Sequence, residues 1–451
     1  MSLSQLASDS LLLPAFAAVR ANGGAPGLDG VTVDAFAERF AEQLPRLQSE
    51  LLGGAFRPQP LRALSIPKPA GGTRTLGIPA VRDRVVLEAL RLLLAPLWEP
   101  TFSPFSFAYR PGRSAQDAVA TAQRFLGEGR SWVVDLDIEK FFDHVDHVRL
   151  MLRLGQRVTD TAVLDLIADF LRAGRRWPDG TLEPTREGIA QGSPLSPLLA
   201  NIVLDELDQE YTRRGWPFVR YADDCILLAR SEAEGQAILA FTESFLHTRL
   251  HLRLNREKTR LVRPEDTAFL GFTYRLSRYG QVTRAVTRDA LAAFRARVVE
   301  LARPHGGRSF QELVESVAQF VRGWSAYYGF AGDRTVRAAR AHARARLRAA
   351  AWELWATPRE RQRQLVALGV PSEESEAATY QLHLPEDWGT LPILARALPD
   401  AWFRPHGLGN QLPSRRVAAK LGPAALATEN ARLREENARL RAELARLRPG
   451  A

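Results

Sequence analysis

The stretch Val219-Arg220-Tyr221-Ala222-Asp223-Asp224-Cys225-Ile226-Leu227-Leu228 decides the fold of this chain. Apolar residues flank a tight turn that carries two adjacent carboxylates, so the pattern predicts a β-hairpin with Asp223 and Asp224 at its tip. Neighbouring carboxylates repel each other and are costly to desolvate, and a bridging cation relieves both costs. Carboxylate oxygens are ligands that suit Mg²⁺. The alternative is a solvated turn, because Asp is common in turns.

The composition restricts the class of protein to which the chain can belong. Its 451 residues suffice for two or three domains, and a hydrophobic content of 45% suffices for a core. No apolar run is long enough to span a bilayer, and no signal peptide is recognisable. One cysteine excludes an internal disulfide and a Cys-based zinc site. We therefore expect a cytoplasmic protein without a membrane partner.

The charge balance indicates a polyanionic partner. The net charge is +10 and the pI is near 10.2. The lysines are Lys68, Lys140, Lys258 and Lys420, and every other cationic side chain apart from His is Arg. This bias is typical of a GC-rich genome, so the abundance of Arg is weak evidence for binding, whereas the few lysines are more informative.

A second acidic site is predicted where a strand over residues 132–138 ends. Asp135 and Asp137 alternate along this strand and share a face. An Asp at the end of a buried strand is costly without a cation, so we expect one sheet to carry Asp137 together with Asp223 and Asp224 in an α+β chain. Three carboxylates at neighbouring strand ends suit two Mg²⁺ ions, one activating a primer 3′-hydroxyl and one holding a triphosphate.

A predicted hairpin carries two basic side chains. Residues 64–69 and 73–79 read as strands around Ala70-Gly71-Gly72, and Lys68 and Arg74 project from them. Fixed cations of this kind would clamp a triphosphate. The alternative is an exposed, solvated hairpin.

Two further Arg-rich segments are candidate nucleic-acid contacts. In the segment 105–114, aromatic residues are interleaved with Arg110 and Arg113, a composition that suits a phosphate backbone or a stacked base. The alternative is an aromatic core plug with solvated arginines. In the second segment, spacings of three and four residues predict a basic stripe on one helix face, formed by Arg334, Arg337, Arg340 or Arg344, and Arg348. Its alternative is a solvated face.

Helix signals divide the rest of the chain. We expect Asp34 to cap an N-terminal helix that ends at Gly53-Gly54, and Ser196 to cap a helix that has Pro197 in its first turn and runs to about Arg213. Further helices are predicted over residues 83–97 (amphipathic), 148–173 and 231–250, and residues 269–274 are predicted as a β segment. After residue 286 the chain reads as helical.

The C-terminal segment has a coiled-coil pattern. Leucines recur every seven residues at Leu426, Leu433, Leu440 and Leu447, and the a positions are Asn430, Asn437 and Leu444. Glu at the g positions matches Arg at the e positions, and Asn at a favours dimers. We therefore expect a parallel homo-oligomer, and the alternative is a helix that packs on its own protein.

Several motifs together resemble one family. Tyr221-Ala222-Asp223-Asp224 resembles the YADD box of reverse transcriptases, and the likeness to group II intron-encoded enzymes extends over about residues 25 to 415. The matching blocks, in order, are Gly27–Val31, Arg110–Ser114, Asp137–Asp143, Gln191–Pro197, Leu254–Thr259 and the maturase-like Arg322–Tyr328. Several ordered blocks make the resemblance specific.

The resemblance implies a right-hand polymerase fold, with fingers, an antiparallel palm sheet and a helical thumb, and it implies roles for the acidic and basic residues. The catalytic metal ligands would be Asp137, Asp223, Asp224 and the carbonyl of Ile138. Contacts to the triphosphate would come from Lys68 and Arg74. The cofactor would be Mg²⁺, with Mn²⁺ as an alternative.

The resemblance also implies roles around the nucleotide. Phe142 would exclude a ribose 2′-hydroxyl, so the product would be DNA, and Gln191 would line the pocket. Lys258 would protonate the leaving pyrophosphate, which agrees with the retention of Lys at a position where Arg could not readily give up a proton. The primer grip would comprise Phe269, Leu270 and Gly271, continuing to Phe272.

The expected domains follow from these blocks. We expect an N-terminal extension over 1–64, fingers and palm over 65–285, a helical thumb or maturase-like domain over 286–370, an irregular part over 371–422 and a coiled coil over 424–448. The paired Cys and His of an HNH nuclease, which often follows in this family, are missing from the sequence. Together with the coiled coil, this favours a free-standing, host-adopted enzyme in defence, CRISPR spacer capture or repair over an intron-mobility protein.

Three functions remain open at this point. An RNA-templated DNA polymerase would use an RNA template, a DNA or RNA primer and dNTPs. A maturase would bind and fold a structured non-coding or intron RNA through its basic surface, a role that does not require three intact carboxylates. An RNA-templated RNA polymerase is disfavoured by Phe142.

Overall fold

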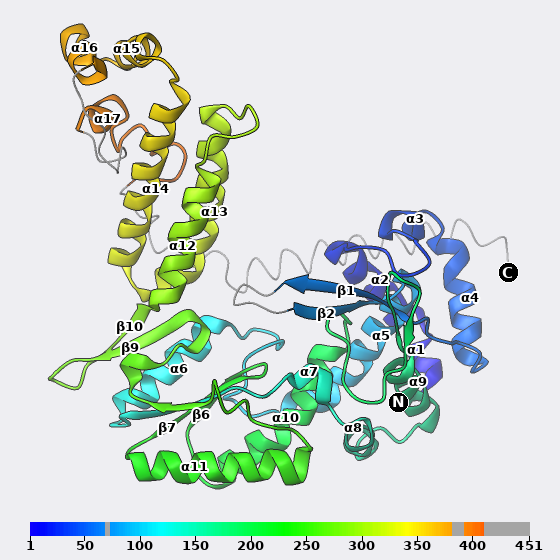
Figure 1. The fold of residues 1–451 in the computed structure, drawn as a ribbon. Coiled ribbons are helices and arrows are strands. Elements are labelled where there is room, and N and C mark those ends of the chain that lie inside the picture. The colour runs from blue at the N-terminus through cyan, green and yellow to red at the C-terminus, as the bar shows by residue number, and fades with distance from the viewer. Residues whose placement is uncertain (68–72, 381–391, 410–451) are drawn as a thin grey trace. The chain divides into compact units, whose positions relative to one another are not determined.

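The computed structural model describes residues 1–67, 73–380 and 392–409, and these form two compact units (Figure 1). The first unit comprises the described residues from Met1 to Arg263, and the second begins at Pro264. Both combine helices with antiparallel strands, which confirms the expected α+β class. Residues 424–448, and with them every predicted coiled-coil position, lie outside the described residues.

Four N-terminal helices open the first unit: α1 Leu3–Leu6, α2 Asp9–Asn22, α3 Val33–Glu38 and α4 Phe40–Leu52. Phe16 of α2 stacks on Phe40 of α4 with ring centroids 3.7 Å apart, so burial of aromatic faces holds this layer together. The predicted cap of α3 is wrong by two residues. The hydroxyl of Thr32 accepts the N–H of Ala35 at 3.1 Å, and Asp34 lies in the first turn. The single helix predicted up to Gly53 is two helices, since Arg39 separates α3 from α4, but α4 does end before Gly53, as predicted.

The predicted basic hairpin is confirmed as β1 Leu61–Pro67 and β2 Thr73–Ile78, which pair antiparallel with Ile66 opposite Arg74. A parallel contact joins β1 to β4 Arg175–Arg176, and β4 pairs with β5 Leu182–Glu183. Lys68 lies outside the described residues.

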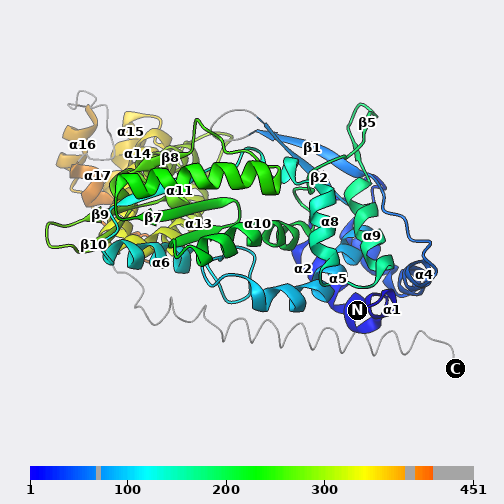
Figure 2. The same ribbon diagram turned by 90° about the horizontal axis from the view of Figure 1, so that it is seen from below.

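A four-stranded antiparallel sheet positions the acidic residues. Its order is β6 Phe218–Tyr221, β7 Asp224–Ala229, β3 Trp132–Leu136 and β8 Arg260–Val262. The predicted Asp-Asp hairpin is confirmed as β6 and β7, with Tyr221 opposite Asp224. Helix α11 Glu232–Phe245 packs against β3 and β7, and Figures 1 and 2 show it lying along one face of the sheet. The helix predicted over residues 231–250 is confirmed: Ser231 is its N-cap, and a π-helical turn continues it over Leu246–Leu250.

The other elements of the first unit are α5 Val81–Trp98, η1 Glu99–Thr101, α6 Ala115–Gly127, α7 Phe141–His144, α8 His147–Gly155, α9 Thr161–Arg172 and α10 Ser196–Arg213. Three predictions about them were inexact. Helix α5 is buried on most faces, including Asp83 and Arg84, and is not amphipathic. Residues 148–173 form two helices because Asp160 caps a new one. Helix α10 has Leu195 at its N-cap, so Ser196 is its first residue.

The second unit begins with short 3₁₀ turns, η3 Pro264–Asp266 and η4 Phe269–Gly271, and a hairpin of β9 Phe272–Leu276 and β10 Val282–Val286. The predicted β segment from residue 269 therefore starts three residues later. The helices that follow are α12 Arg288–Leu301, α13 Phe310–Tyr328, η5 Gly329–Ala331, α14 Asp333–Leu354, α15 Pro358–Ala367, α16 Ser372–Tyr380 and α17 Pro392–Ala397. Helices α16 and α17 lie in the segment that the sequence indicated as irregular.

Apolar side chains give each unit its own core. In the first unit the fully buried Leu90, Leu204 and Leu227 belong to one cluster. In the second unit Val317, Leu347 and Phe403 belong to another. None of the described helices is both long enough and apolar enough to cross a bilayer.

Candidate active site

The turn between β6 and β7 presents Asp223 at the end of the sheet. Ala222 has a positive φ of 60°, an uncommon conformation for a residue with a Cβ, and Asp224 is the first residue of β7. The strands on either side are buried, so the core holds the turn between them. Strained backbone of this kind clusters at functional sites.

Backbone pairing brings Asp137 and Lys258 together. Asp137 follows β3, and its carbonyl accepts the N–H of Asn255 at 2.8 Å. The Nζ of Lys258 lies 3.5 Å from Oδ2 of Asp137. Residues 121 positions apart are therefore neighbours because the segment before β8 pairs beside the end of β3.

The carboxylates of Asp137 and Asp223 interact electrostatically. Burial and the negative charge of Asp137 raise the pKa of Asp223 above its ordinary value, although Arg220 partly opposes that rise. A nearby positive charge would stabilise the ionised Asp223 against both effects.

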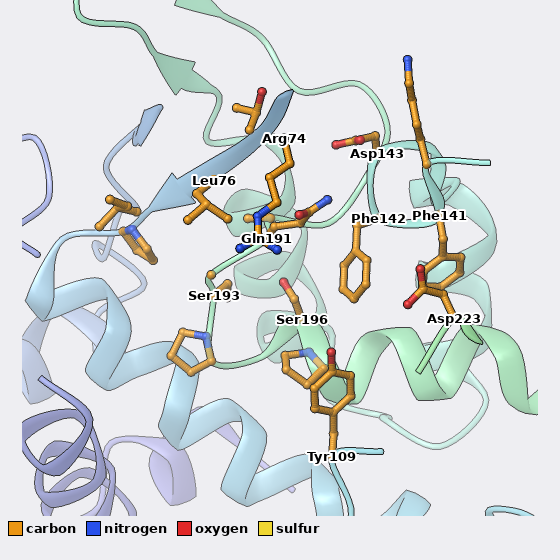
Figure 3. Close-up of a pocket in the computed structure, with 18 of the residues that line it drawn as sticks. Arg74, Leu76, Tyr109, Phe141, Phe142, Asp143, Gln191, Ser193, Ser196 and Asp223 are labelled. Carbon is orange, nitrogen blue, oxygen red and sulfur yellow. The ribbon is translucent and has the colours of Figure 1, made fainter. Parts of the chain in front are cut away.

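One cleft of about 1530 Å³ collects most of the predicted site residues. The predicted residues that line it are Arg74, Asp137, Ile138, Phe142, Gln191, Asp223 and Lys258. In Figure 3 the Arg74 side chain points from β2 toward Gln191, and Phe142 lies between Gln191 and Asp223. The basic side chain of Arg74 and the acidic side chain of Asp223 therefore lie on opposite sides of the Phe142 ring. Asp224 belongs to the same turn but does not line the cleft.

A glycine loop holds the segment that carries Phe142. The carbonyl of Phe142 accepts the N–H of Ile189 at 2.7 Å, and the N–H of Gly188 donates to Val145 at 2.7 Å. Gly188 has φ +88°, and a Cβ there would lie 2.6 Å from the carbonyl oxygen of Asp143. Only glycine fits this approach, so the loop that carries Gln191 also fixes the backbone of Phe142.

The acidic pair fits a divalent cation. Among the described residues no group of three or more His, Cys, Asp or Glu side chains forms a ready metal cluster. Asp137 and Asp223 nevertheless carry hard oxygen ligands, and a cation would offset both the burial and the repulsion by Asp137 that raise the pKa of Asp223. We therefore treat these two residues as the core of a candidate metal site.

Comparisons with known proteins give the family of this chain. Residues 66–274 match the family described as reverse transcriptase (RNA-dependent DNA polymerase), and residues 291–368 match the group II intron maturase-specific domain. The chain is 34% identical over 299 residues to protein YkfC of Escherichia coli strain K12, covering 57% of this chain and 78% of YkfC. It belongs to the group II intron-type reverse transcriptases.

Two further matches extend the comparison. The group II intron-encoded protein LtrA of Lactococcus lactis subsp. cremoris is 30% identical over 322 residues, covering 56% of this chain and 53% of LtrA, so the chain spans about half the length of that relative. Among solved structures, a chain of a partial Cas6-RT-Cas1–Cas2 complex is 25% identical, with a TM-score of 0.35, covering 55% of this chain and 42% of that chain.

Several arginines predicted to bind nucleic acid in this reverse transcriptase are structural. Arg110 is 8% exposed and donates to Glu99 and to the carbonyls of Ser103 and Ser106, so it holds its own loop. Arg113 is half-buried and donates to the carbonyl of Pro104 at 2.7 Å. The prediction for Arg110 was wrong because a sequence motif does not reveal which carbonyls surround a side chain.

The predicted stripe on α14 divides into exposed and buried arginines. Arg344 and Arg348 are 3% and 8% exposed and form ion pairs with Asp400, so they are not available to a ligand. Arg334 and Arg337 are exposed and remain candidates. The spacing correctly predicted one helix, but three of the arginines named for the stripe are buried, because Arg340 is 7% exposed and donates to the carbonyl of Gly409.

The predicted primer grip is a tight backbone turn. Phe269 is fully buried, so its side chain belongs to the core. Leu270 has φ 53°, and its carbonyl accepts the hydroxyl of Tyr327 at 3.1 Å. A Cβ on Gly271 would lie 2.5 Å from the Tyr328 hydroxyl, so α13 fits closely around this glycine. If this turn binds a primer, the contacts would come from the backbone of residues 270–271 and not from the side chain of Phe269.

Two cleft residues were missed by the sequence reasoning. Tyr109 lines the cleft with φ 62° and 56% exposure, and burial together with the charge of Asp223 raises the pKa of its phenol. Nothing in its sequence context distinguished it from a core aromatic residue. Lys140 also lines the cleft, and the scarcity of lysine was a usable signal for it.

Proposed function

We propose that this chain is a two-metal RNA-directed DNA polymerase that adds dNTPs to a primer 3′-hydroxyl on an RNA template. The observation that carries the proposal is the convergence of Arg74, Phe142, Gln191, Asp223 and Lys258 on one cleft from segments far apart in the sequence. A purely RNA-binding surface has no need of two closely spaced, mutually repelling carboxylates beside basic side chains that could bind phosphate.

The acidic residues would hold the ions. Asp137, Asp223, Asp224 and the carbonyl of Ile138 would bind Mg²⁺, with Mn²⁺ as a substitute. Bound divalent cations supply charge neutralisation at a triphosphate and acidify a primer hydroxyl. Arg74 would bind the phosphates from the opposite wall, and Lys68 would extend that clamp.

Lys258 would deliver a proton to the leaving pyrophosphate. Its ammonium group is at 3.5 Å from Asp137 and lines the cleft. An ammonium can give up a proton near neutral pH when a phosphate oxygen becomes basic, whereas a guanidinium cannot. Lys258→Arg should therefore retain nucleotide binding and lose rate.

A carboxylate exchange tests the function. The double variant Asp223→Asn with Asp224→Asn should reduce primer extension on an RNA template by at least about a thousandfold, because both metal ligands lose their charge. Asp135→Asn is the matched control, since this carboxylate lies on β3, pairs with Arg260 at 3.4 Å and does not line the cleft. Extension by the double variant at the wild-type rate would refute polymerisation as the function.

A second substitution tests the choice of sugar. Phe142→Ala would open the cleft beside the nucleotide ribose, so incorporation of ribonucleotides should rise relative to deoxyribonucleotides. Leu76→Ala, on the opposite wall of the same cleft, is the control for enlarging the cavity. Unchanged selectivity in Phe142→Ala would remove this residue from the role of gate.

RNA maturation is a second candidate function. The match of residues 291–368 to a maturase-specific domain and the exposed Arg334 and Arg337 on α14 favour it. The partner would be a structured non-coding or intron RNA. If the biological activity survives the Asp223→Asn and Asp224→Asn exchange, this function replaces polymerisation; intron sequence or defence and CRISPR genes beside the gene would distinguish intron mobility from a host-adopted role.

Self-association through residues 424–448 belongs to the same proposal. The heptad pattern supports a parallel homo-oligomer. Deletion of residues 424–451 should lower the mass measured by light scattering, and a monomeric mass before and after deletion would refute it.

A further inference from the structure

A buried arginine lies directly behind the catalytic turn. Arg220 is in β6, two residues before Ala222, and is 1% exposed. Its five N–H groups all have acceptors: Nε donates to Asp208 at 2.8 Å, Nη1 to Asn201 Oδ1 and to the carbonyl of Ala222, both at 2.9 Å, and Nη2 to Ser106 Oγ at 2.8 Å and to Asp208 at 2.6 Å. A guanidinium has five donors, so its capacity is filled.

The same cluster also reaches the backbone beside Tyr109, a residue that lines the cleft and has a positive φ. Asn201 accepts from Arg220 and donates its amide to the carbonyl of Ala108 at 3.0 Å, immediately before Tyr109. Tyr109 and Ala222 have φ values of 62° and 60°, and both are near Asp223. One hydrogen-bonded cluster therefore holds both left-handed backbones beside the candidate metal site.

The backbone of Arg220 makes the same connection. Its N–H donates to Phe105 at 2.9 Å, and its carbonyl accepts from Phe107 at 3.0 Å. The loop that ends in Tyr109 is thus tied to β6 by main chain and side chain. A change in the position of Arg220 would move both walls of the acidic end of the cleft together.

Stability alone does not account for this cluster. Asp208 is fully buried, and the desolvation of two charges consumes most of the attraction between them. Burial by itself lowers the pKa of Arg220, but the charge of Asp208 and its hydrogen bonds raise it above the ordinary value, so the guanidinium stays ionised. Apolar side chains of similar volume often serve a core equally well, whereas they could not bind the Ala222 carbonyl.

We propose that Arg220 is a positioning residue that sets the conformation of the Ala222-Asp223 turn and so directs the Asp223 carboxylate to the metal. Asp208 keeps the guanidinium charged, and Ser106 and Asn201 orient it. This inference rests on the proposed two-metal function and extends it to a residue that touches neither nucleotide nor metal.

Arg220→Lys tests the proposal because an ammonium group carries its three donors on a single nitrogen. It cannot reproduce the planar guanidinium, which donates from three nitrogens to Asp208, Asn201, Ser106 and Ala222. Mn²⁺ alone is titrated into the full chain and followed by electron paramagnetic resonance, with thermal unfolding measured in parallel. We expect Arg220→Lys to weaken Mn²⁺ binding at least tenfold. Arg153→Lys is the matched control. Arg153 pairs at 3.0 Å with Asp205, a buried acid that lies in α10 as Asp208 does, and Arg153 does not line the cleft.

Ser106→Ala is a milder second variant, in case Arg220→Lys does not fold. It removes one hydrogen bond to Nη2 and should weaken Mn²⁺ binding about two- to fivefold. Loss of thermal stability with Mn²⁺ affinity within 1.5-fold of wild type in the folded variants would make the cluster merely structural and overturn the proposal. Absence of Mn²⁺ binding in the wild-type chain would overturn the proposed function as well, so the two failures are distinguishable.

Discussion

Each unit contains an arginine–aspartate cluster whose arginines are buried, and the two clusters have different roles. Arg220 binds Asp208 in the first unit, and Arg344 and Arg348 bind Asp400 in the second. In both, an arginine also donates to backbone carbonyls: Arg220 to Ala222, Arg344 to Leu408 and Arg348 to Leu398. The role of each cluster follows from the backbone carbonyl to which its arginine donates.

The acceptors explain the difference. Leu398 and Leu408 lie after α17, so Arg344 and Arg348 fasten the end of the helical unit onto α14. Ala222 lies in the turn that carries Asp223, so Arg220 acts on a reactive group. Exposure differs as well, because the side chain of Asp208 is 0% exposed and that of Asp400 is 40% exposed. The role of each buried arginine therefore follows from the backbone carbonyl that it binds and not from its ion pair with Asp.

The largest effect is expected for Asp208→Ala. It leaves Arg220 buried and unpaired, which should lower the free energy of unfolding by about 4–5 kcal/mol, measured by urea denaturation. The double variant Asp208→Leu with Arg220→Met removes both charges and should recover most of that loss without recovering Mn²⁺ binding. Recovery of Mn²⁺ affinity in the double variant would erase the distinction between the two clusters.

Asp400→Ala should have the next largest effect. It removes the acceptor of two buried guanidinium groups and should cost about 3–4 kcal/mol, the lower part of the range for a broken buried pair because Asp400 is partly exposed. Mn²⁺ affinity should stay at the wild-type value. A loss of Mn²⁺ affinity that matches that of Arg220→Lys would contradict a purely structural role for this cluster.

Asp83 is a buried acid to compare with Asp208, because no arginine donates two hydrogen bonds to it among those that the structure describes. It accepts the N–H of Gln59 at 2.8 Å, and burial raises its pKa from 3.8 to about 6. Between these values the folded state holds a proton that the unfolded state has released, so the free energy of unfolding falls as pH rises through this window. The difference corresponds to at most about 3 kcal/mol. Asp83→Asn should remove this pH dependence and stabilise the chain above pH 6; parallel unfolding profiles from pH 4 to pH 8 would disprove the assignment.

The smallest effect on stability is expected at the exposed arginines of α14. Arg334→Gln with Arg337→Gln should change the free energy of unfolding by less than about 0.5 kcal/mol. If both bind phosphates, the slope of log affinity against log salt for single-stranded RNA should fall by about 1.4. Arg359→Gln with Arg363→Gln, which removes two exposed charges from α15, is the control for net charge. Equal slopes in the two double variants would exclude a specific phosphate contact on α14.

Local patterns carried much of the prediction. The hairpin β6–β7 follows from apolar runs on both sides of a two-carboxylate turn, and β1–β2 follows from strands around Ala70-Gly71-Gly72. These signals succeed because turn residues and alternation act over a few positions. Arg110 and Arg344 were misassigned because their partners are carbonyls and acids that a spacing rule cannot locate. The acid that pairs with Arg344 is 56 residues away.

The sequence by itself determined the Asp-Asp hairpin, the family and the identity of the acids, because motifs of a few residues specify turns and chemistry. Only the tertiary structure decided which arginines are buried, that Gly188 fixes the backbone of Phe142, and that Arg220 holds Ala222 in a left-handed conformation. Those outcomes depend on a few ångströms between segments far apart in the chain. Hydrogen bonds are made or lost over such distances, and sequence spacing does not encode them.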